Sequence, residues 1–403
     1  MLTSVHIKNF RSCKDVKIDD MGPMLGLVGR NGAGKTTILR AIEWAASTAL
    51  STKDFSNLLS EVDLGDALAE PRAEVEFRVG ENEYRYAVGR ELEPEANTNG
   101  KRIDRDRESL FVKNPESRQW ISLVRRMDDV VTLVDRGQQI EINLMAGAMP
   151  ALASLLPESD PIQVHLRGLV STLSGIRYYL GHGVVDPAYP LVLEQGGPIS
   201  KLAYDKWVET NGQAAEPFPS LLLRLIHAYE TAPDTFAELK SRLGTDGLGL
   251  LEDIRVTTLE SSKGPGRARS YYDVMFVPAG LNVELLLSQL SGGTRQMLYL
   301  MLALLLDKSS TMLIEQPEDG IHPALLAKLI DIFRVNADPT QIILTSHSPT
   351  VLSSLEPADV RLVEMRDGST RVRALTEAEV LRAQEYMQRE GTLAEFLELI
   401  QED

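Results

Sequence analysis

The sequence is poor in the features that mark secreted and membrane proteins. It has a single cysteine, Cys13, so no internal disulfide can form, which is typical of a reducing compartment. Its longest apolar run, Met297 to Leu306, reaches only about half of the roughly 20 residues that a membrane-spanning helix needs. The first residues, MLTSVHIKNFRS, contain no apolar signal core. We therefore expect a cytoplasmic protein with no membrane partner.

Aromatic and basic residues are scarce as well. Aromatics make up 6% of the 403 residues, and 58 acidic side chains outnumber 42 basic ones, which gives a net charge of -16. Such a chain is unsuited to coating nucleic acid indiscriminately, and no aromatic platform for single strands stands out, although a local basic patch would still permit binding. Hydrophobic residues amount to 43%, enough for a large core, and the length indicates two or three lobes.

Hydrophobic periodicity indicates an ordered first part, residues 1–90, followed by an inserted arm, residues 91–280. The first part is expected to hold strands at 5–10, 24–28, 72–79 and 83–88 and a helix from 36. In the arm, the stretch PEANTNGKRIDRDRE is interpreted as an exposed connection because it mixes charges of both signs. Helical spacing over 222–243, with Gly244 as a C-terminal cap, makes the arm mostly helical.

The end of the chain regains regular order. Residues 281–375 alternate helices from Ser291 and Pro323 with apolar strands at 312–315 and 341–345. This β–α alternation predicts a mostly parallel sheet. The tail, 376–403, is expected to be a polar helix that begins with a capping box.

The strongest motif is a phosphate loop at residues 29–36, GRNGAGKT, placed between an apolar strand and a helix. Its glycines let backbone N–H groups point at a phosphate, and the helix adds its positive end. A helix end alone contributes about 0.3–1 kcal/mol, whereas several charge-assisted hydrogen bonds contribute about 1.5–3 kcal/mol each. We expect Lys35 to bridge the β- and γ-phosphates and Thr36 to hold Mg²⁺.

A second anion site is expected at Ser291, Gly292 and Gly293, directly before a long apolar helix. Ser291 is well placed as an N-cap, and the glycines leave nearby N–H groups uncovered. The chain carries one phosphate loop, and this second site lies far along the sequence from Lys35. If both sites serve one nucleotide, a second copy of the chain must supply one of them.

With these motifs the chain resembles the ABC-type ATPases of the RecF, SMC and OLD-like branch. The resemblance lies in FRS, GRNGAGKTT, LSGGTRQ, LIEQPEDGIHP and TSHSP, which cover both ends of the chain but little of the arm. It implies an α/β P-loop NTPase fold with a mixed sheet, and a head that forms a homodimer around two ATP molecules with Mg²⁺. The nucleotide-binding residues so expected are Arg11, Gly29, Asn31, Gly32, Ala33, Gly34, Lys35, Thr36, Thr37, Ser291, Gly292 and Gly293.

An apolar strand ends in Glu315, which puts a carboxylate at the edge where α/β proteins bind ligands. The resemblance gives Glu315 the position that orients Mg²⁺, and it places Gln316 where ABC-type enzymes usually carry the glutamate that polarises the attacking water. Glutamine cannot accept that proton, and losing a general base costs about 10² to 10⁴ in rate. We expect slow ATP hydrolysis, with Glu318 or a group of the arm as a substitute. The alternative is a pseudo-enzyme that binds ATP without cleaving it.

The histidines and glutamines are assigned by the same resemblance. His347 fits the switch histidine that contacts the γ-phosphate. His322 is expected at an interface or helix start, because no second His or Cys lies at zinc spacing. The glutamine that senses Mg²⁺ should fall between residues 90 and 200, where Gln138 and Gln139 are candidates.

The stretch after His347 is too short for a TOPRIM nuclease domain, and no heptad run indicates a coiled-coil arm. We therefore expect an ATP-gated subunit that controls a separate effector protein, a nuclease or toxin, in bacterial phage defence or DNA surveillance. The alternative is an autonomous RecF-like repair ATPase that binds DNA. In either case the candidate contacts to a phosphate backbone are Arg125, Arg126, Lys263, Arg267 and Arg269. A transporter ATPase is disfavoured, since no membrane-coupling sequence is evident.

Overall fold

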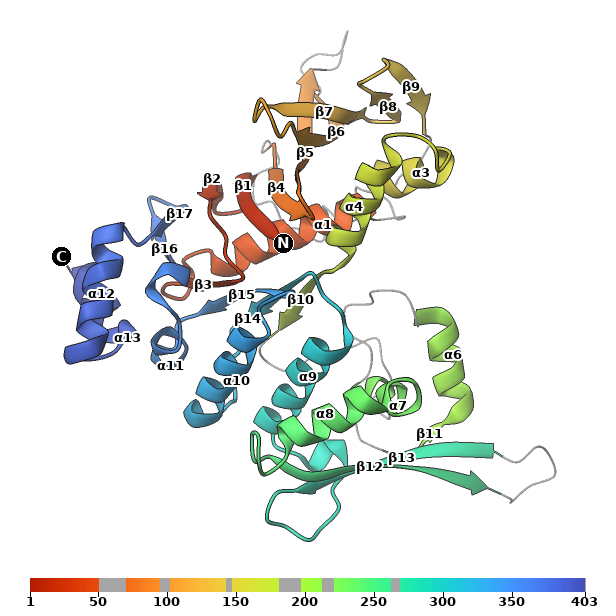
Figure 1. Ribbon diagram of the computed structural model, residues 1–403, viewed down its shortest axis with the longest axis vertical. Coiled ribbons are helices and arrows are strands. Elements are labelled where there is room, and N and C mark those ends of the chain that lie inside the picture. Colours follow the sequence, from red (N-terminus) through yellow and green to blue (C-terminus); the bar gives the residue numbers. More distant parts are fainter. Residues whose placement is uncertain are drawn as a thin grey trace. The chain divides into compact units, whose positions relative to one another are not determined.

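The computed structural model in Figure 1 describes residues 1–50, 70–94, 102–142, 147–180, 197–211, 221–261 and 269–402. The chain forms two compact units. The first consists of Met1–Tyr178, Ser309–Glu315 and Phe333–Asp403, and the second of Tyr179–Lys308 and Gln316–Ile332. The phosphate loop therefore lies in the first unit and the LSGG segment in the second. Across the described ranges, no helix combines the length and apolar character needed to cross a membrane.

An antiparallel sheet of eight strands, in the order β2-β1-β4-β5-β6-β7-β8-β9, belongs to the first unit. Its strands are β1 (Leu2–Phe10), β2 (Cys13–Ile18), β4 (Arg72–Val79), β5 (Asn82–Pro94), β6 (Arg102–Lys113), β7 (Trp120–Met127), β8 (Val130–Leu133) and β9 (Gln138–Glu141). Successive side chains point to opposite faces, so in β4 the apolar Ala73, Val75 and Phe77 are fully buried while the charged residues between them are not. One face of the sheet thus contributes to the core.

The charged stretch at residues 102–108 is part of strand β6 and not the exposed connection that its composition predicts. Glu108 is fully buried and pairs with Arg126 of β7 at 2.8 Å. The arm, residues 91–280, is therefore not mostly helical in its described part, because it contributes strands to the N-terminal sheet in addition to the helices expected there.

Three helices pack together beside this sheet. Helix α1 (Lys35–Leu50) contacts β1, β4 and β5 as well as α3 (Ala148–Leu155) and α4 (Gln163–Ser174). It buries residues on most of its surface, including Ile38, Leu39 and Ile42. This burial fixes the helix whose first turn closes the phosphate loop.

A six-stranded sheet carries the motif-bearing strands, in the order β10-β14-β15-β3-β16-β17. Its strands are β10 (Ile176–Leu180), β14 (Thr311–Glu315), β15 (Gln341–Ser346), β3 (Met24–Val28), β16 (Val360–Arg366) and β17 (Ser369–Ala374). The pairs β14–β15, β15–β3 and β3–β16 are parallel, and β16–β17 is antiparallel. Every residue of β3, β14 and β15 is buried, as is typical of parallel strands. The mixed, mostly parallel sheet expected from the sequence is confirmed.

The second unit combines helices with a small sheet of order β11-β13-β12. Its elements include β11 (Ile199–Ser200), α6 (Lys201–Asn211), α7 (Leu221–Thr231), α8 (Pro233–Leu243), β12 (Leu251–Ser261), β13 (Arg269–Pro278) and α9 (Gly292–Leu306). Helix α9 packs against α7 and α8. The two helices expected at 222–243 are confirmed as α7 and α8, with Gly244 as the C-cap residue.

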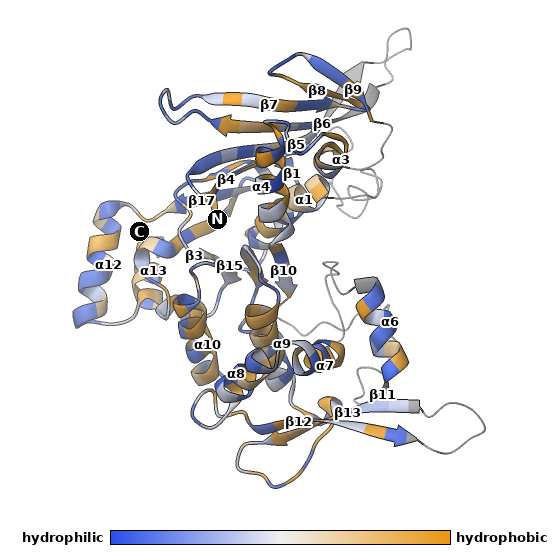
Figure 2. Ribbon diagram, turned by 45° about the vertical axis from the view of Figure 1, so that its right-hand side comes forward, coloured by the Kyte–Doolittle hydropathy of each residue, from blue (hydrophilic) through white to orange (hydrophobic). Residues whose placement is uncertain are grey.

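The remaining helices are α10 (Pro323–Val335), α11 (Pro349–Ser353), α12 (Glu377–Arg389) and α13 (Leu393–Glu402). Helix α12 begins with the expected capping box, in which Thr376 Oγ1 accepts from the Glu379 N–H at 3.2 Å. It is mostly hydrophilic (Figure 2), and Ala383 is its buried residue. The tail is completed by α13, whose apolar face includes the buried Leu393, Phe396 and Leu397.

Candidate functional site

The loop between β3 and α1 has the tight conformation that its glycines predict. Gly32 and Gly34 have φ angles of +79° and +99°, which other residues rarely adopt. A Cβ on Gly34 would lie 2.0 Å from Thr370 Oγ1, and one on Gly29 would lie 2.0 Å from the Val363 carbonyl oxygen. These positions require glycine, because β16 and β17 approach the loop too closely for a side chain.

Lys35 lies inside this loop. Its side chain is folded back so that Nζ donates to the carbonyl oxygens of Gly29, at 2.7 Å, and Arg30, at 3.0 Å. The residue is 4% exposed. The ammonium group is thus held at the centre of the loop by backbone oxygens.

The FRS turn packs against the same loop. Arg11 occupies the turn between β1 and β2 with a φ of +52°. Its neighbour Ser12 lies 2.8 Å from Thr370 Oγ1 through its hydroxyl, and Thr370 donates to the Ala33 carbonyl at 3.1 Å. The structure therefore brings the Arg11 turn to the phosphate loop and leaves Asn31 exposed on it. Thr370 was not singled out by any sequence motif.

Glu315 meets Thr36 at the end of β14. The Thr36 hydroxyl donates to Glu315 Oε1 at 2.5 Å, and the hydroxyl of Tyr178 on β10 donates to Glu315 Oε2. Glu315 is 9% exposed, so its carboxylate is nearly removed from solvent. The two residues assigned to Mg²⁺ are in direct contact. Tyr178 is an additional member of the site that no sequence motif marks.

Parallel register brings His347 to the same sheet edge. Glu315 is opposite Thr345, and Ser346 is opposite Val28. The carboxyl ends of β14, β15 and β3 therefore lie side by side, and the chain continues from them into Gln316, His347 and the phosphate loop. The His347 side chain is exposed.

Gln316 begins a turn in the second unit. Its φ of +45° is unusual for a residue with a side chain. The turn is closed by backbone hydrogen bonds from Asp319 to Gln316 and from Ile321 to Glu318, both at 3.2 Å. Gln316 and Glu318 are half-buried.

Ser291 caps α9 as expected. Its Oγ accepts from the backbone N–H of Thr294 at 3.1 Å. Ser291 and Gly292 are exposed, and a Cβ on Gly292 would meet open space. A Cβ on Gly293 would instead lie 2.4 Å from the Gly320 carbonyl oxygen. The first glycine leaves the helix end uncovered, and the second permits close packing on the turn that follows Gln316.

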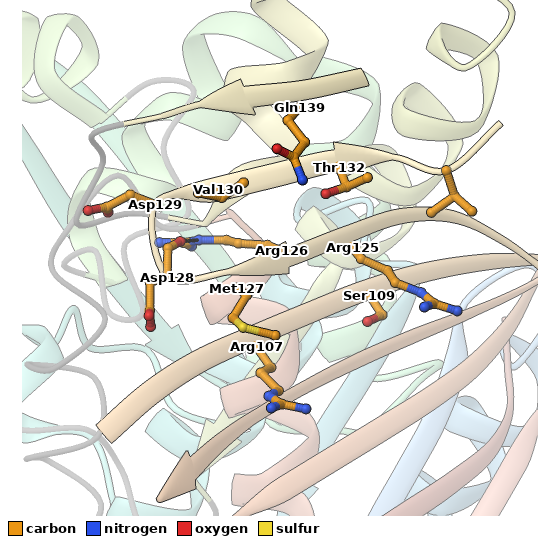
Figure 3. A pocket seen from close by; sticks show the side chains of 11 residues that line it. Arg107, Ser109, Arg125, Arg126, Met127, Asp128, Asp129, Val130, Thr132 and Gln139 are labelled. Atoms are coloured by element: carbon orange, nitrogen blue, oxygen red, sulfur yellow. Dashed lines mark hydrogen bonds between the residues drawn. The ribbon is translucent and has the colours of Figure 1, made fainter. Parts of the chain in front are cut away.

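The basic candidates for nucleic-acid contact have different environments. Arg126 is buried and bonded to Glu108 and to the backbone oxygen of Asp128, so its expected role as an exposed phosphate contact is wrong. Arg125 is exposed, and with Arg107 it lines a cavity of about 730 Å³ on strands β6–β9 (Figure 3). Lys263, Arg267 and the Arg269 side chain lie outside the described part of the chain.

Other candidates lie on separate elements. Gln138 and Gln139 are exposed on β9, the edge strand of the eight-stranded sheet, and Gln139 lines the same cavity as Arg125. His322 precedes α10, where its Nδ1 accepts from the Ala324 N–H at 3.3 Å. His322 is thus a helix-start residue, one of the two roles expected of it.

Comparison with known proteins gives two family matches. Residues 187–353 match the family described as "AAA domain, putative AbiEii toxin, Type IV TA system", and residues 4–148 match a second AAA-domain family. An OLD nuclease of Thermus scotoductus is 54% identical over 43 residues, 11% of this chain and 8% of that protein. The uncharacterized protein MJECL10 of Methanocaldococcus jannaschii is 32% identical over 62 residues, 15% of this chain and 28% of that protein. The chain thus matches well under half the length of these curated relatives.

A solved structure extends the similarity to nearly the whole fold. An SMC head bound to the C-winged helix domain of ScpA superposes with a TM-score of 0.52 and 15% identity, covering 94% of this chain and 99% of that one. The similarity shows that the chain has the fold of an SMC head, a P-loop NTPase fold, as expected from its motifs. The AAA-domain matches and the OLD-nuclease segment support the resemblance to the RecF, SMC and OLD-like ATPases that the motifs predict.

Proposed function

We propose that this protein is an ATPase that binds ATP with Mg²⁺, dimerises around two nucleotides and turns over slowly. The observation that carries the proposal is the joined arrangement of Lys35, Thr36 and Glu315 at one sheet edge. A phosphate loop, a hydroxyl and a buried carboxylate at this edge are suited to a triphosphate and its metal.

The loop supplies a preorganised phosphate site. Its backbone N–H groups and the start of α1 would bind the β-phosphate, and the Lys35 ammonium would exchange the carbonyl oxygens of Gly29 and Arg30 for phosphate oxygens. Each charge-assisted hydrogen bond contributes about 1.5–3 kcal/mol. Because Gly29 and Gly34 are fixed by β16 and β17, the loop has little freedom to lose when ATP binds.

The donor set fits Mg²⁺. Thr36 and Glu315 offer hard oxygen atoms already in contact, and Mg²⁺ is usually held by one or two protein oxygens together with waters and substrate phosphates. Among the described residues, no group of three or more His, Cys, Asp or Glu side chains forms a metal cluster. When bound, the metal would neutralise charge on the β- and γ-phosphates.

Gln316 limits the hydrolysis rate in this proposal. An amide can orient a water by hydrogen bonding but cannot take its proton. Proton removal would then fall to solvent or to Glu318, which lies in the same turn, and His347 would contact the γ-phosphate. Slow turnover makes the ATP-bound state long-lived, which suits a switch better than a motor.

The ATP-bound dimer would gate a separate effector protein, a nuclease or toxin, in phage defence or DNA surveillance. The exposed Ser291 end of α9 would bind the γ-phosphate of the nucleotide on a second copy of the chain. Support for a toxin or nuclease as the effector comes from the family match described as a putative AbiEii toxin and from the OLD-nuclease segment. Recovery of neither a second polypeptide nor nucleic acid with tagged protein from its native host would rule out the gating role. ATP-stimulated, salt-sensitive DNA binding by the purified protein alone would favour the RecF-like alternative.

The ATPase proposal is tested by steady-state hydrolysis and ATP titration of three proteins. Wild type is expected to bind ATP and turn over slowly. Gln316→Glu should raise kcat by about 10²- to 10⁴-fold, because it restores a general base. Lys35→Ala should lose ATP binding, since no other cation of the loop is held at its centre. Normal ATP affinity in Lys35→Ala would contradict the phosphate-loop assignment, and unchanged kcat in Gln316→Glu would contradict the role given to Gln316.

A further inference from the structure

Tyr178 is buried against the carboxylate at the end of β14. It lies on β10, the edge strand beside β14, and is 5% exposed. Its hydroxyl donates to Glu315 Oε2, while the Thr36 hydroxyl donates to Oε1. Both carboxylate oxygens are therefore held, one from α1 and the other from β10.

Arg40 holds the Tyr178 ring in place. The Arg40 guanidinium carbon lies 3.9 Å from the ring centroid, and the same guanidinium pairs with Glu43 at 2.8 Å. Thr36 and Arg40 are four residues apart on α1, so they project from the same side of the helix. One face of α1 thus supplies both a direct contact to Glu315 and a support for the tyrosine that contacts it.

The tyrosine acts as a neutral donor. A phenol carries no charge, and the buried Tyr178 hydroxyl donates a hydrogen bond to Glu315 Oε2. A lysine or arginine in this place would cancel the negative charge of Glu315. A neutral hydroxyl fixes the orientation of the carboxylate and leaves its charge for a cation.

We propose that Tyr178 is a positioning residue for the Mg²⁺ site, which orients Glu315 so that Oε1 stays directed at Thr36. This inference rests on the proposed function of Thr36 and Glu315. Groups that hydrogen-bond to a metal ligand typically change metal affinity or activity by about 10- to 100-fold. We expect loss of the Tyr178 hydroxyl to weaken metal binding by a factor in the same range.

The test compares two neighbouring tyrosines on one strand. Tyr178→Phe removes the hydroxyl and keeps the ring under Arg40. Tyr179→Phe is the matched control, because the Tyr179 hydroxyl donates to Asp307 at 2.7 Å.

Mn²⁺ binding is measured by electron paramagnetic resonance with a non-hydrolysable ATP analogue bound. Tyr178→Phe should weaken Mn²⁺ binding by about 10- to 100-fold, while analogue binding without metal and the unfolding temperature stay unchanged. Tyr179→Phe should match wild type.

The outcomes separate this inference from the proposed function. Mn²⁺ affinity in Tyr178→Phe within about twofold of wild type would overturn the positioning role and leave the ATPase proposal standing. Failure of wild type to bind the analogue and Mn²⁺ would overturn both. If Tyr178→Phe is poorly folded, Arg40→Gln is tested in its place. This substitution removes the guanidinium that packs on the Tyr178 ring and keeps the hydroxyl. Weaker Mn²⁺ binding in Arg40→Gln supports the inference, and wild-type affinity refutes it.

Discussion

At the scale of single residues, Glu108 and its buried ion pair with Arg126 tie strand β6 to three other elements of the first unit. Glu108 accepts hydrogen bonds from Arg126 at 2.8 Å, from the Tyr86 hydroxyl at 2.7 Å and from the Ala148 N–H at 3.0 Å. These donors come from β7, β5 and the start of α3. Burial and this carboxylate raise the pKa of Tyr86 well above its ordinary value, so its hydroxyl remains a donor.

Glu108→Ala should lower the free energy of unfolding by about 3–5 kcal/mol, because it leaves a buried guanidinium without its counter-charge. The double variant Glu108→Leu, Arg126→Met should recover much of this loss, since it removes both charges. Glu83→Ala on the same sheet is the control. Its ion pairs with Lys113 and Arg118 are partly exposed, so it should cost less than about 1 kcal/mol. Chemical denaturation measures all three. An equal loss of unfolding free energy in Glu108→Ala and Glu83→Ala would contradict the stabilising role given to the buried ion pair of Glu108 and Arg126.

The residues of the site differ in how readily sequence predicts them. Lys35, Thr36 and Ser291 belong to short local patterns whose spacing follows from loop and cap geometry. The structure places Lys35 inside the glycine loop, Thr36 against Glu315 and Ser291 at the start of α9. Tyr178 has no such pattern. In the strand IRYYL it is indistinguishable from a core aromatic, because its partner Glu315 is brought beside it by the pairing of β10 with β14.

At the scale of elements, the packing of α9 depends on the second glycine of its first turn. Gly293→Ala would place a Cβ 2.4 Å from the Gly320 carbonyl oxygen, so one backbone must move. The expected cost is about 1–3 kcal/mol of unfolding free energy, as for other overpacked sites.

Gly292→Ala is the matched control for this substitution. Its Cβ would meet open space, and alanine favours a helix over glycine by up to about 1 kcal/mol, so stability should stay equal or rise. Thermal unfolding without nucleotide compares the two variants. Equal unfolding temperatures would mean that α9 does not pack closely on the turn after Gln316.

Elements were predictable where their signals are local. The β3–loop–α1 segment, the α9 cap and the α12 capping box follow from residues a few positions apart. Strand β6 was not predictable, because its many charges are typical of a solvated loop. The residue that neutralises Glu108 is Arg126, which lies 18 positions away on another strand. The structure of residues 102–141 therefore depends on pairing between strands far apart in the sequence. The residue pattern within a single strand does not predict that pairing.

At the scale of the whole molecule, the two halves of the proposed nucleotide site lie in different compact units. The phosphate loop, Glu315 and His347 belong to the first, and Ser291 belongs to the second. ATP shared between two chains would join the first unit of one to the second unit of the other. Such a contact is isologous, because each chain gives and receives the same surface, and it closes at two copies.

Ser291→Arg should abolish ATP-driven dimerisation while leaving ATP binding by the monomer unchanged. The substituted side chain would fill the exposed helix end that the γ-phosphate of the second chain must approach, and it lies in the unit that does not contain the phosphate loop. Light scattering with ATP and Mg²⁺ should give twice the 44.6 kDa protomer mass for wild type and the protomer mass for the variant. Ser154→Arg, at an exposed serine of α3, should dimerise like wild type. A dimer of Ser291→Arg as stable as that of wild type would remove the shared site from the proposal, because only a nucleotide held between two chains requires this serine to be uncovered.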